Sequence, residues 1–473
     1  MDKNAFNRKQ YFSLILTLCL VHLLLGLDIN IVSVSLPSIA EHFKVNAGVV
    51  TRVGWVYFLV LTSFLLLFGR LGDLKGFKKV YLSGILLFAI GSFLASQSRV
   101  FDFLIFSRVI QAVGAAILFA LAPAIISTFL PEERRGKIFG MTYACIALGG
   151  ITGRALSGYL IVFCGWNAVF LVGIPIALIA FLLTFKAIPG KQPSRVGGKF
   201  DLAGSFLVFF SLLCFLYLVN TGQAYGWFST PIITLAVGSL AFGYLSVRRE
   251  KRIAHPLLDL KILKERNLSF PLLSFLFIYL ITNGVIYIFP FFLQWVRGIP
   301  KTHIGMLMAV MSVAQMVSGY ISGCLSDRLS KARITIFAAG MTLLSLMLFA
   351  LLGPSSDATT IIALLIAYGV GIGSFIPANT NRVMAHAPLF EKGSVSSFMA
   401  TVVRAGSALG VCLFGAIFTF FVPEKNPLQA KVPVEKIMSG ITTTFLFGIV
   451  VASLALLVIL KANRETMRGK GVE

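Results

Sequence analysis

Long uninterrupted runs of apolar residues are the feature that most restricts how this 473-residue chain can fold. A hydrocarbon core about 30 Å thick needs roughly 20 apolar residues per helix, whereas barrel strands alternate apolar and polar residues over about ten positions. Fourteen runs meet the helical requirement, at about 12–34, 48–69, 79–98, 102–125, 138–162, 166–186, 201–220, 229–247, 268–293, 303–325, 333–353, 359–380, 395–421 and 440–461. The sequence therefore predicts an all-α polytopic membrane protein with 14 transmembrane helices.

Composition and the first run agree with this interpretation. Hydrophobic residues make up 57% of the chain and charged residues only 12%, against about 25% charged in a typical soluble domain. Such a chain cannot cover a surface that faces water, which excludes a soluble globular enzyme. The first run begins like a signal peptide but continues past Asp28 to Val34 without a small-residue cleavage site, so we expect an uncleaved first helix.

The charge of the chain is strongly positive, at +23. If the N-terminus is placed inside, 30 of the 41 Lys and Arg residues fall in inside segments, as the positive-inside rule requires. The basic residues therefore predict topology, and we expect no nucleic-acid partner. The prediction is a multi-pass protein of the cytoplasmic membrane with both termini in the cytoplasm.

Two basic loops repeat each other. The segment 69–79 reads GRLGDLKGFKK and the segment 323–333 reads GCLSDRLSKAR, with Gly, Leu and Asp matching at a constant offset of 254 residues. Repeated halves are typical of secondary transporters. The loops lie eight spans apart, where two six-span halves would give six. We therefore predict a six-helix bundle at 1–200, two additional spans at 201–250 and a second six-helix bundle at 251–473.

The loop at 69–79 resembles the signature loop of the major facilitator superfamily, and the fourteen spans resemble its drug:proton antiporter-2 family. Further segments resemble that family's motifs in the expected order, at 27–37, 108–116, 255–264 and 404–410. The resemblance implies a major facilitator fold and secondary active transport of a small molecule by alternating access. Most members of the family export drugs, and some import vitamins such as riboflavin.

The resemblance also implies a gating role for the repeated loops. In the family, a carboxylate at a helix end contacts a neighbouring helix terminus in only one access state, and Asp73 and Asp327 hold the matching positions. The alternative is an ordinary solvated loop aspartate. The predicted gating residues are Gly69, Asp73, Gly76, Lys78, Asp327 and Arg328.

Asp28 is the acidic residue that lies well inside a predicted span, where a charge is costly and indicates function. At about 1.5 Å per helical residue, Asp28 and Arg108 each lie about 9 Å from the outer ends of their spans, and Arg154 lies about 14 Å deep. We expect Asp28 to pair with Arg108, Arg154 or both. Such an acid can either carry the coupling proton or form a static ion pair that holds the spans together.

The fifth span departs from the antiporter motif that the family associates with efflux. The expected Gly-Pro step reads Gly153-Arg154, and the terminal paired glycines read Ser157-Gly158. A charged Arg154 must face a cavity or a partner rather than lipid.

In the ninth span Tyr279, Asn283 and Tyr287 recur every four residues. They form a stripe on one helix face, which is either a pocket wall or ordinary packing. The predicted substrate-binding residues are Gln111, Arg154, Tyr279, Asn283, Tyr287, Gln315 and Arg404.

The embedded charges are one Asp and three Arg, which suit a planar, hydrogen-bonding, neutral or anionic solute. We favour uptake of a vitamin-like solute such as riboflavin, with proton-coupled multidrug efflux as the alternative; a lipid flippase and a solute sensor are further possibilities.

The five histidines are scattered and form no nucleophile–base or metal constellation. We therefore expect no enzymatic activity, no catalytic residues, no metal and no cofactor. The expected partners are the solute, protons and the lipid bilayer, and the expected state is a monomer.

Overall fold

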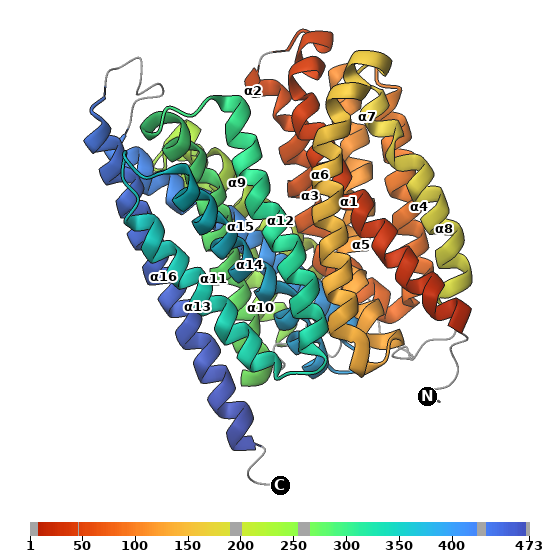
Figure 1. Ribbon diagram of the computed structural model, residues 1–473. Helices are drawn as coiled ribbons and strands as arrows, with labels where there is room; N and C mark the ends of the chain where they lie inside the picture. The colour runs from red at the N-terminus through yellow and green to blue at the C-terminus, as the bar shows by residue number, and fades with distance from the viewer. Residues whose placement is uncertain (1–7, 46, 190–200, 254–264, 423–431, 470–473) are drawn as a thin grey trace. The chain divides into compact units, whose positions relative to one another are not determined.

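The computed structural model describes residues 8–45, 47–189, 201–253, 265–422 and 432–469, and all regular secondary structure in these ranges is helical (Figure 1). The predicted motif at 255–264 lies outside the described residues. The helices before residue 190 are α1 (Arg8–Phe43), α2 (Ala47–Val50), α3 (Arg52–Lys75), α4 (Phe77–Ser96), α5 (Phe101–Phe129), η1 (Glu132–Arg134), α6 (Arg135–Cys164), α7 (Ala168–Leu171) and α8 (Gly173–Ala187). Those that follow are α9 (Leu202–Tyr225), α10 (Thr230–Glu250), α11 (Arg266–Phe291), η3 (Phe292–Val296), α12 (Lys301–Ser326), α13 (Lys331–Ala350), α14 (Ala358–His386), α15 (Lys392–Phe421) and α16 (Val434–Gly469).

Within the described ranges, 13 helices are long and apolar enough to cross a membrane. The remaining predicted run, 201–220, forms α9, whose described apolar stretch Ala203–Val219 is shorter than the others. The predicted all-α membrane fold is confirmed. In the interior of each helix the backbone N–H and C=O groups bond to one another, as a hydrocarbon environment requires.

The residues fall into two compact units. Unit 1 comprises Met1–Cys214, Val237–Leu260 and Ala387–Thr401, and unit 2 comprises Phe215–Ala236, Lys261–His386 and Val402–Glu473. The first part of helix α15, up to Thr401, therefore belongs to unit 1, and the remainder belongs to unit 2. The domain boundaries at 200 and 250 stay a prediction.

Glycines allow α1 and α6 of unit 1 to pack closely along much of their length. A Cβ on Gly153 would lie 2.7 Å from the backbone oxygen of Leu27, and one on Gly149 would overlap the backbone oxygen of Leu23. Both glycines must therefore stay without side chains. Their four-residue spacing is the GxxxG arrangement that brings two membrane helices together.

Unit 2 repeats this arrangement with α11 and α15. A Cβ on Gly406 would lie 2.6 Å from the backbone oxygen of Leu276, and one on Gly410 would overlap that of Leu280. A pair of glycines four residues apart again faces two carbonyl oxygens four residues apart. The close helix pair thus occurs once in each unit, which extends the internal repeat of the sequence to the packing of the helices.

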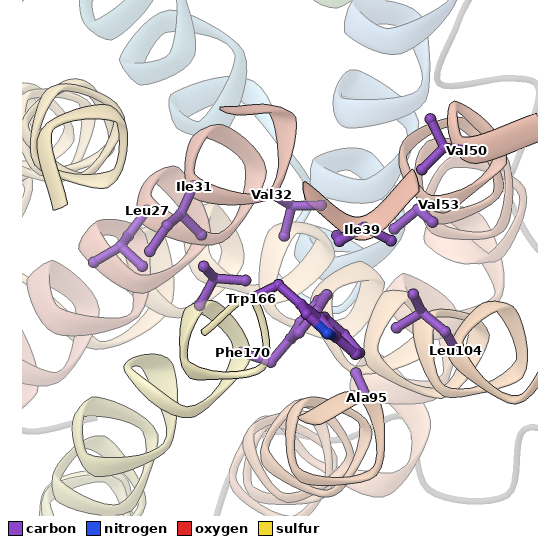
Figure 2. Packing of buried hydrophobic residues seen from close by; sticks show 11 residues of the cluster. Leu27, Ile31, Val32, Ile39, Val50, Val53, Ala95, Leu104, Trp166 and Phe170 are labelled. Atoms are coloured by element: carbon purple, nitrogen blue, oxygen red, sulfur yellow. The ribbon is translucent and has the colours of Figure 1, made fainter. Parts of the chain in front are cut away.

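A cluster of buried apolar side chains lies at one end of unit 1. Figure 2 shows side chains from several helices gathered around Trp166 and Phe170. The members are Leu27, Ile31, Val32, Ile39, Val50, Val53, Ala95, Leu104, Trp166, Val169 and Phe170, each exposed by 6% or less. The cluster ties α1, α3, α4 and α5 together next to the buried charges described below.

Polar contacts join α9 to α10 inside unit 1. The guanidinium of Arg249 donates to both carboxylate oxygens of Asp201 at 2.9–3.0 Å, and Asp201 also accepts the backbone N–H of Gly204 at the start of α9. Further along, Ser211 and Ser239 each donate a hydroxyl hydrogen bond to the other's carbonyl oxygen, at 3.0 and 3.2 Å. Helices α9 and α10 thus form a helical hairpin over this part of their length.

Candidate functional site

A buried ion pair joins α1 to α5 in unit 1. The Arg108 guanidinium donates to both oxygens of the Asp28 carboxylate, at 3.1 and 3.2 Å, and the two residues are 1% and 4% exposed. Gln111 completes the group, because its side-chain amide donates to Asp28 at 2.8 Å and to the Ser92 hydroxyl at 2.7 Å, while its oxygen accepts from Arg108 at 2.5 Å. The carboxylate is therefore held by one cation and one amide from a single helix.

Helix α3 covers the other side of the Arg108 side chain. The ring of Tyr57 lies 4.2 Å from the guanidinium carbon, close enough for a cation–π interaction. The Arg108 Nε donates to the carbonyl oxygen of Val53 at 3.3 Å. Phe170 of the apolar cluster lies 5.8 Å away. The guanidinium is thus enclosed by aromatic rings and backbone, with its charge compensated by Asp28.

The two charges of this pair depend on each other. Removing one partner of a buried, hydrogen-bonded ion pair costs about 3–5 kcal/mol, because the other charge remains without compensation. Loss of either charge would therefore weaken the link between α1 and α5.

Arg154 does not share this site. Its side chain is exposed on α6, and the ion pair of Asp28 is with Arg108. Depth along a span does not specify the face on which a residue lies, so the depths calculated from the sequence do not distinguish the two arginines. One turn before Arg154, a Cβ on Gly150 would lie 3.0 Å from the Asn30 side chain, so the neighbouring position of α6 faces an amide of α1.

Asp73, at the C-terminal end of α3, caps the start of α15 within unit 1. Its carboxylate accepts the backbone N–H groups of Gly393 and Ser394 and the Ser394 hydroxyl, all at 2.8 Å. Asp73 is only 4% exposed. A negative charge that accepts the first N–H groups of a helix stabilises that terminus. The carboxylate therefore contacts a helix terminus, rather than lying as a solvated loop residue.

A second set of contacts fixes the same terminus to α5. The buried ammonium group of Lys392 donates to the carbonyl oxygen of Ser127, near the C-terminal end of α5 where a cation is favourable. The Ser396 hydroxyl donates to the carbonyl oxygen of Ala120 at 2.6 Å. The first turn of α15 is thus held by a carboxylate of α3 and by two carbonyl groups of α5.

The other predicted gating residues lie in the two repeated loops, at 69–79 and at 323–333. A Cβ on Gly69 would overlap Ser397 and the Gly393 backbone, and Gly76 joins α3 to α4 with a φ of 90°, which favours glycine. The Lys78 ammonium lies 4.9 Å from the centre of the Phe185 ring. Asp327 directly follows α12 and is half-buried, and Arg328 is exposed.

The predicted substrate-binding residues divide between two environments. Gln111 is part of the buried ion-pair network of unit 1. In unit 2, the Asn283 amide donates to the Tyr279 carbonyl oxygen at 3.1 Å and to the Ser407 hydroxyl of α15 at 3.0 Å. Arg404 is half-buried one turn before Ser407 on α15.

The remaining stripe residue, Tyr287, packs edge-to-face on Phe291, with ring centres 5.5 Å apart. Gln315 is half-buried on α12. The stripe on α11 therefore provides a polar connection to α15 at Asn283 and aromatic packing at Tyr287.

Several contributing residues were not predicted. Ser92 and Tyr57 complete the ion-pair network, but an isolated Ser or Tyr in an apolar run gives no pattern in the sequence. The start of α15 could have been found, because Lys392-Gly393-Ser394 precedes a long apolar run and Ser is typical of a helix N-terminus. Only the fold shows that this terminus meets Asp73.

A bundle of membrane-spanning helices with a buried charge pair, a capped helix terminus and a repeated close helix pair defines a multi-span membrane transporter. The family model of the Major Facilitator Superfamily matches residues 18–411, and the chain belongs to that superfamily. The Riboflavin transporter RibZ of Clostridioides difficile (strain 630) is 30% identical over 410 residues, which is 87% of this chain and 89% of the relative. The Multidrug resistance protein Stp of Mycobacterium tuberculosis (strain ATCC 25618 / H37Rv) is 28% identical over 417 residues, 87% of this chain and 76% of the relative.

Solved structures give the same fold at low identity. A bacterial homologue of the iron transporter ferroportin aligns with a TM-score of 0.67 at 13% identity, covering 97% of this chain and 100% of that one. The human organic anion transporter MFSD10 aligns with a TM-score of 0.64 at 14% identity, covering 96% of this chain and 100% of that one. At these identities the likeness establishes the fold alone.

Proposed function

We propose that this chain is a secondary active transporter of the cytoplasmic membrane, in the fourteen-span drug:proton antiporter-2 group, that takes up a planar, neutral or anionic solute such as riboflavin. The observation that carries the proposal is Arg154, which is exposed in the middle of the membrane-spanning helix α6. An arginine at that depth is tolerated where it faces a water-filled cavity. A guanidinium there attracts anionic groups and stacks on planar rings.

Unit 2 offers compatible groups. Tyr279 and Asn283 lie on α11, and the Asn283 amide donates to Ser407 of α15, one turn after Arg404. Binding sites for small molecules combine aromatic surface with a few polar groups that fix orientation. The similarity to the riboflavin transporter RibZ supports a planar heteroaromatic solute of this chemistry.

We propose that Asp28 carries the coupling proton. Support comes from its burial against Arg108 and Gln111, whose hydrogen bonds must rearrange if the carboxylate is protonated. Asp73, with the first turn of α15, is proposed as the gate, since its three hydrogen bonds can only be made when that helix terminus lies against α3. The static ion pair is the competing role for Asp28.

The decisive experiment uses the purified protein in proteoliposomes with an imposed pH gradient and labelled riboflavin. We expect gradient-driven accumulation by the wild type and none by Asp28→Asn, with both proteins present in the membrane at equal amounts. Asp28→Asn should still exchange labelled for unlabelled riboflavin at equilibrium if the residue couples the proton. Full accumulation by Asp28→Asn would refute the coupling role, and absence of riboflavin transport by the wild type would refute the solute.

Proton-coupled multidrug efflux is the second candidate. It is favoured by the similarity to the Multidrug resistance protein Stp and to the Methyl viologen resistance protein SmvA, which is 26% identical over 414 residues. Efflux of ethidium from cells with and without the gene distinguishes the two. Ethidium extrusion or a survival advantage confined to drug exposure, together with unchanged riboflavin uptake, would replace the uptake proposal.

A further inference from the structure

An open groove runs along unit 2 between α12 and α13. Both helices pack along α14 but make little contact with each other, so α14 forms the floor of the groove. The groove has a volume of about 920 Å³, in the range of small-molecule sites. We call it the α12–α13 groove: its α12 wall extends from Met306 to Leu325, Phe337 of α13 lines the opposite side, and Val370 of α14 lies on the floor.

The lining of the groove is mostly apolar, and the two hydroxyl groups on its α12 wall bond to backbone. Ser322 donates to the carbonyl oxygen of Ser374 at 2.5 Å, and Ser318 donates to the carbonyl oxygen of Gln315 at 3.3 Å. The large side chains are exposed instead, with Val317 at 48%, Ile321 at 51% and Phe337 at 55%. A groove of this kind fits a hydrocarbon chain rather than a polar solute.

The length of the groove matches the membrane. From Met306 to Leu325 along α12 is about 28 Å at the rise of an α-helix, against about 30 Å for a hydrocarbon core. The groove is parallel to a membrane-spanning helix, so an extended acyl chain lying in it would have the direction that chains have in a bilayer.

Positive charge lies at one end of the groove. Among the described residues that line it, Arg333 is the charged one, and it lies at the start of α13 beside Leu329. Arg328 lies in the connecting turn with one acid, Asp327, and Lys331 is the first residue of α13. Arg328 and Arg333 are both exposed. The segment 327–333 therefore carries three basic residues against one acidic residue, beside the end of an apolar groove.

We propose that the α12–α13 groove is a binding site for one anionic phospholipid, with an acyl chain along α12 and the phosphate at Arg333. The apolar lining matches an acyl chain, and the basic end matches a phosphate. Each basic residue near a lipid phosphate contributes about 1 kcal/mol, or about fivefold in affinity. The site is independent of the transported solute.

The test is lipid binding to the purified full-length protein by native mass spectrometry, with phosphatidylglycerol and phosphatidylcholine of identical acyl chains. We expect one phosphatidylglycerol to be retained at about fivefold lower lipid concentration than phosphatidylcholine. Arg333→Gln should abolish this preference while leaving phosphatidylcholine binding unchanged. The matched control Arg99→Gln, which removes an exposed arginine of unit 1, should retain the preference.

A second variant tests the acyl-chain part. Val317→Trp places a bulky ring in the groove at an exposed position, and we expect retention of both lipids to fall. Equal retention of both lipids by the wild type, or an unchanged preference in Arg333→Gln, would overturn the proposal. It would also be overturned if the same spectra showed a dimer lost in Val317→Trp, because a second copy would then occupy the groove. If Val317→Trp does not fold, the Arg333→Gln comparison decides alone.

Discussion

Asp73 accepts two hydrogen bonds from Ser394, one from its backbone N–H and one from its hydroxyl group, each 2.8 Å long. The two residues are 321 positions apart, yet both belong to unit 1. A carboxylate at the end of one helix thus holds the first turn of another. This arrangement lets a change in one side chain release an entire helix terminus.

We predict that Asp73→Asn opens this contact. An asparagine presents one acceptor oxygen and an NH₂ group to the donors that the carboxylate now accepts, so at least one buried donor is left without a partner. Such a loss costs about 1–3 kcal/mol. The measurement is the rate of N-ethylmaleimide labelling of Ser397→Cys in a background without the six native cysteines, because position 397 is buried beside Gly69. Labelling should be about tenfold faster with Asp73→Asn.

The matched control is Ser394→Ala, which removes one of the three hydrogen bonds and keeps the negative charge at the helix terminus. It should accelerate labelling less than Asp73→Asn does. Equal labelling rates in all three proteins would show that Asp73 does not hold α15.

We predict that the aromatic ring of Tyr57, rather than its hydroxyl group, stabilises Arg108. Tyr57→Phe keeps the ring 4.2 Å from the guanidinium carbon and should unfold at nearly the wild-type temperature. Tyr57→Leu removes the desolvated cation–π interaction, worth about 2 kcal/mol, and leaves a gap beside it. Thermal unfolding in detergent, followed by tryptophan fluorescence, measures both variants. A larger loss for Tyr57→Phe than for Tyr57→Leu would contradict the interpretation.

The glycines of α6 give a prediction with an internal control. Gly153→Ala would place a Cβ 2.7 Å from the Leu27 backbone oxygen, which forces α1 and α6 apart, whereas a Cβ on Gly158 meets nothing within 4 Å. The first change should destabilise the protein by about 1–3 kcal/mol. The second should be neutral or stabilising, since alanine is favoured over glycine in a helix by about 1 kcal/mol. Unfolding temperatures in detergent distinguish them, and equal temperatures would show that the packing of α1 on α6 tolerates a side chain.

The sequence predicted the helices better than it predicted the contacts between them. Hydrophobic length located the spans, because a membrane requires long apolar helices and permits few alternatives. The rarity of charge within spans identified Asp28 and Arg108 as candidates for an ion pair. The sequence did not show whether Arg108 or Arg154 is the partner of Asp28. The answer depends on how each helix is rotated about its axis, and nearly uniform apolar runs do not indicate that rotation.

The sequence also did not identify which helix terminus Asp73 contacts. The repeated loop identified Asp73, but its partner lies in a distant segment.

The groove in unit 2 was not predicted either, because a convex and a concave apolar helix face have the same sequence pattern. Its shape depends on α12 and α13 diverging over α14.

The exposure of Arg154 leads to the last prediction, which concerns the solute. Arg154→Gln should leave the unfolding temperature unchanged, because an exposed side chain away from packing contacts contributes less than about 0.5 kcal/mol to stability. If the guanidinium contacts the solute, the variant loses a charged hydrogen bond of about 1.5–3 kcal/mol, and the KM for uptake rises about tenfold or more. Arg154→Lys keeps the charge but not the planar group, so it should recover part of the affinity for an anionic solute and little for a neutral one. Initial uptake rates of riboflavin and of its phosphate ester in proteoliposomes separate these cases, and an unchanged KM for both would remove Arg154 from the binding site.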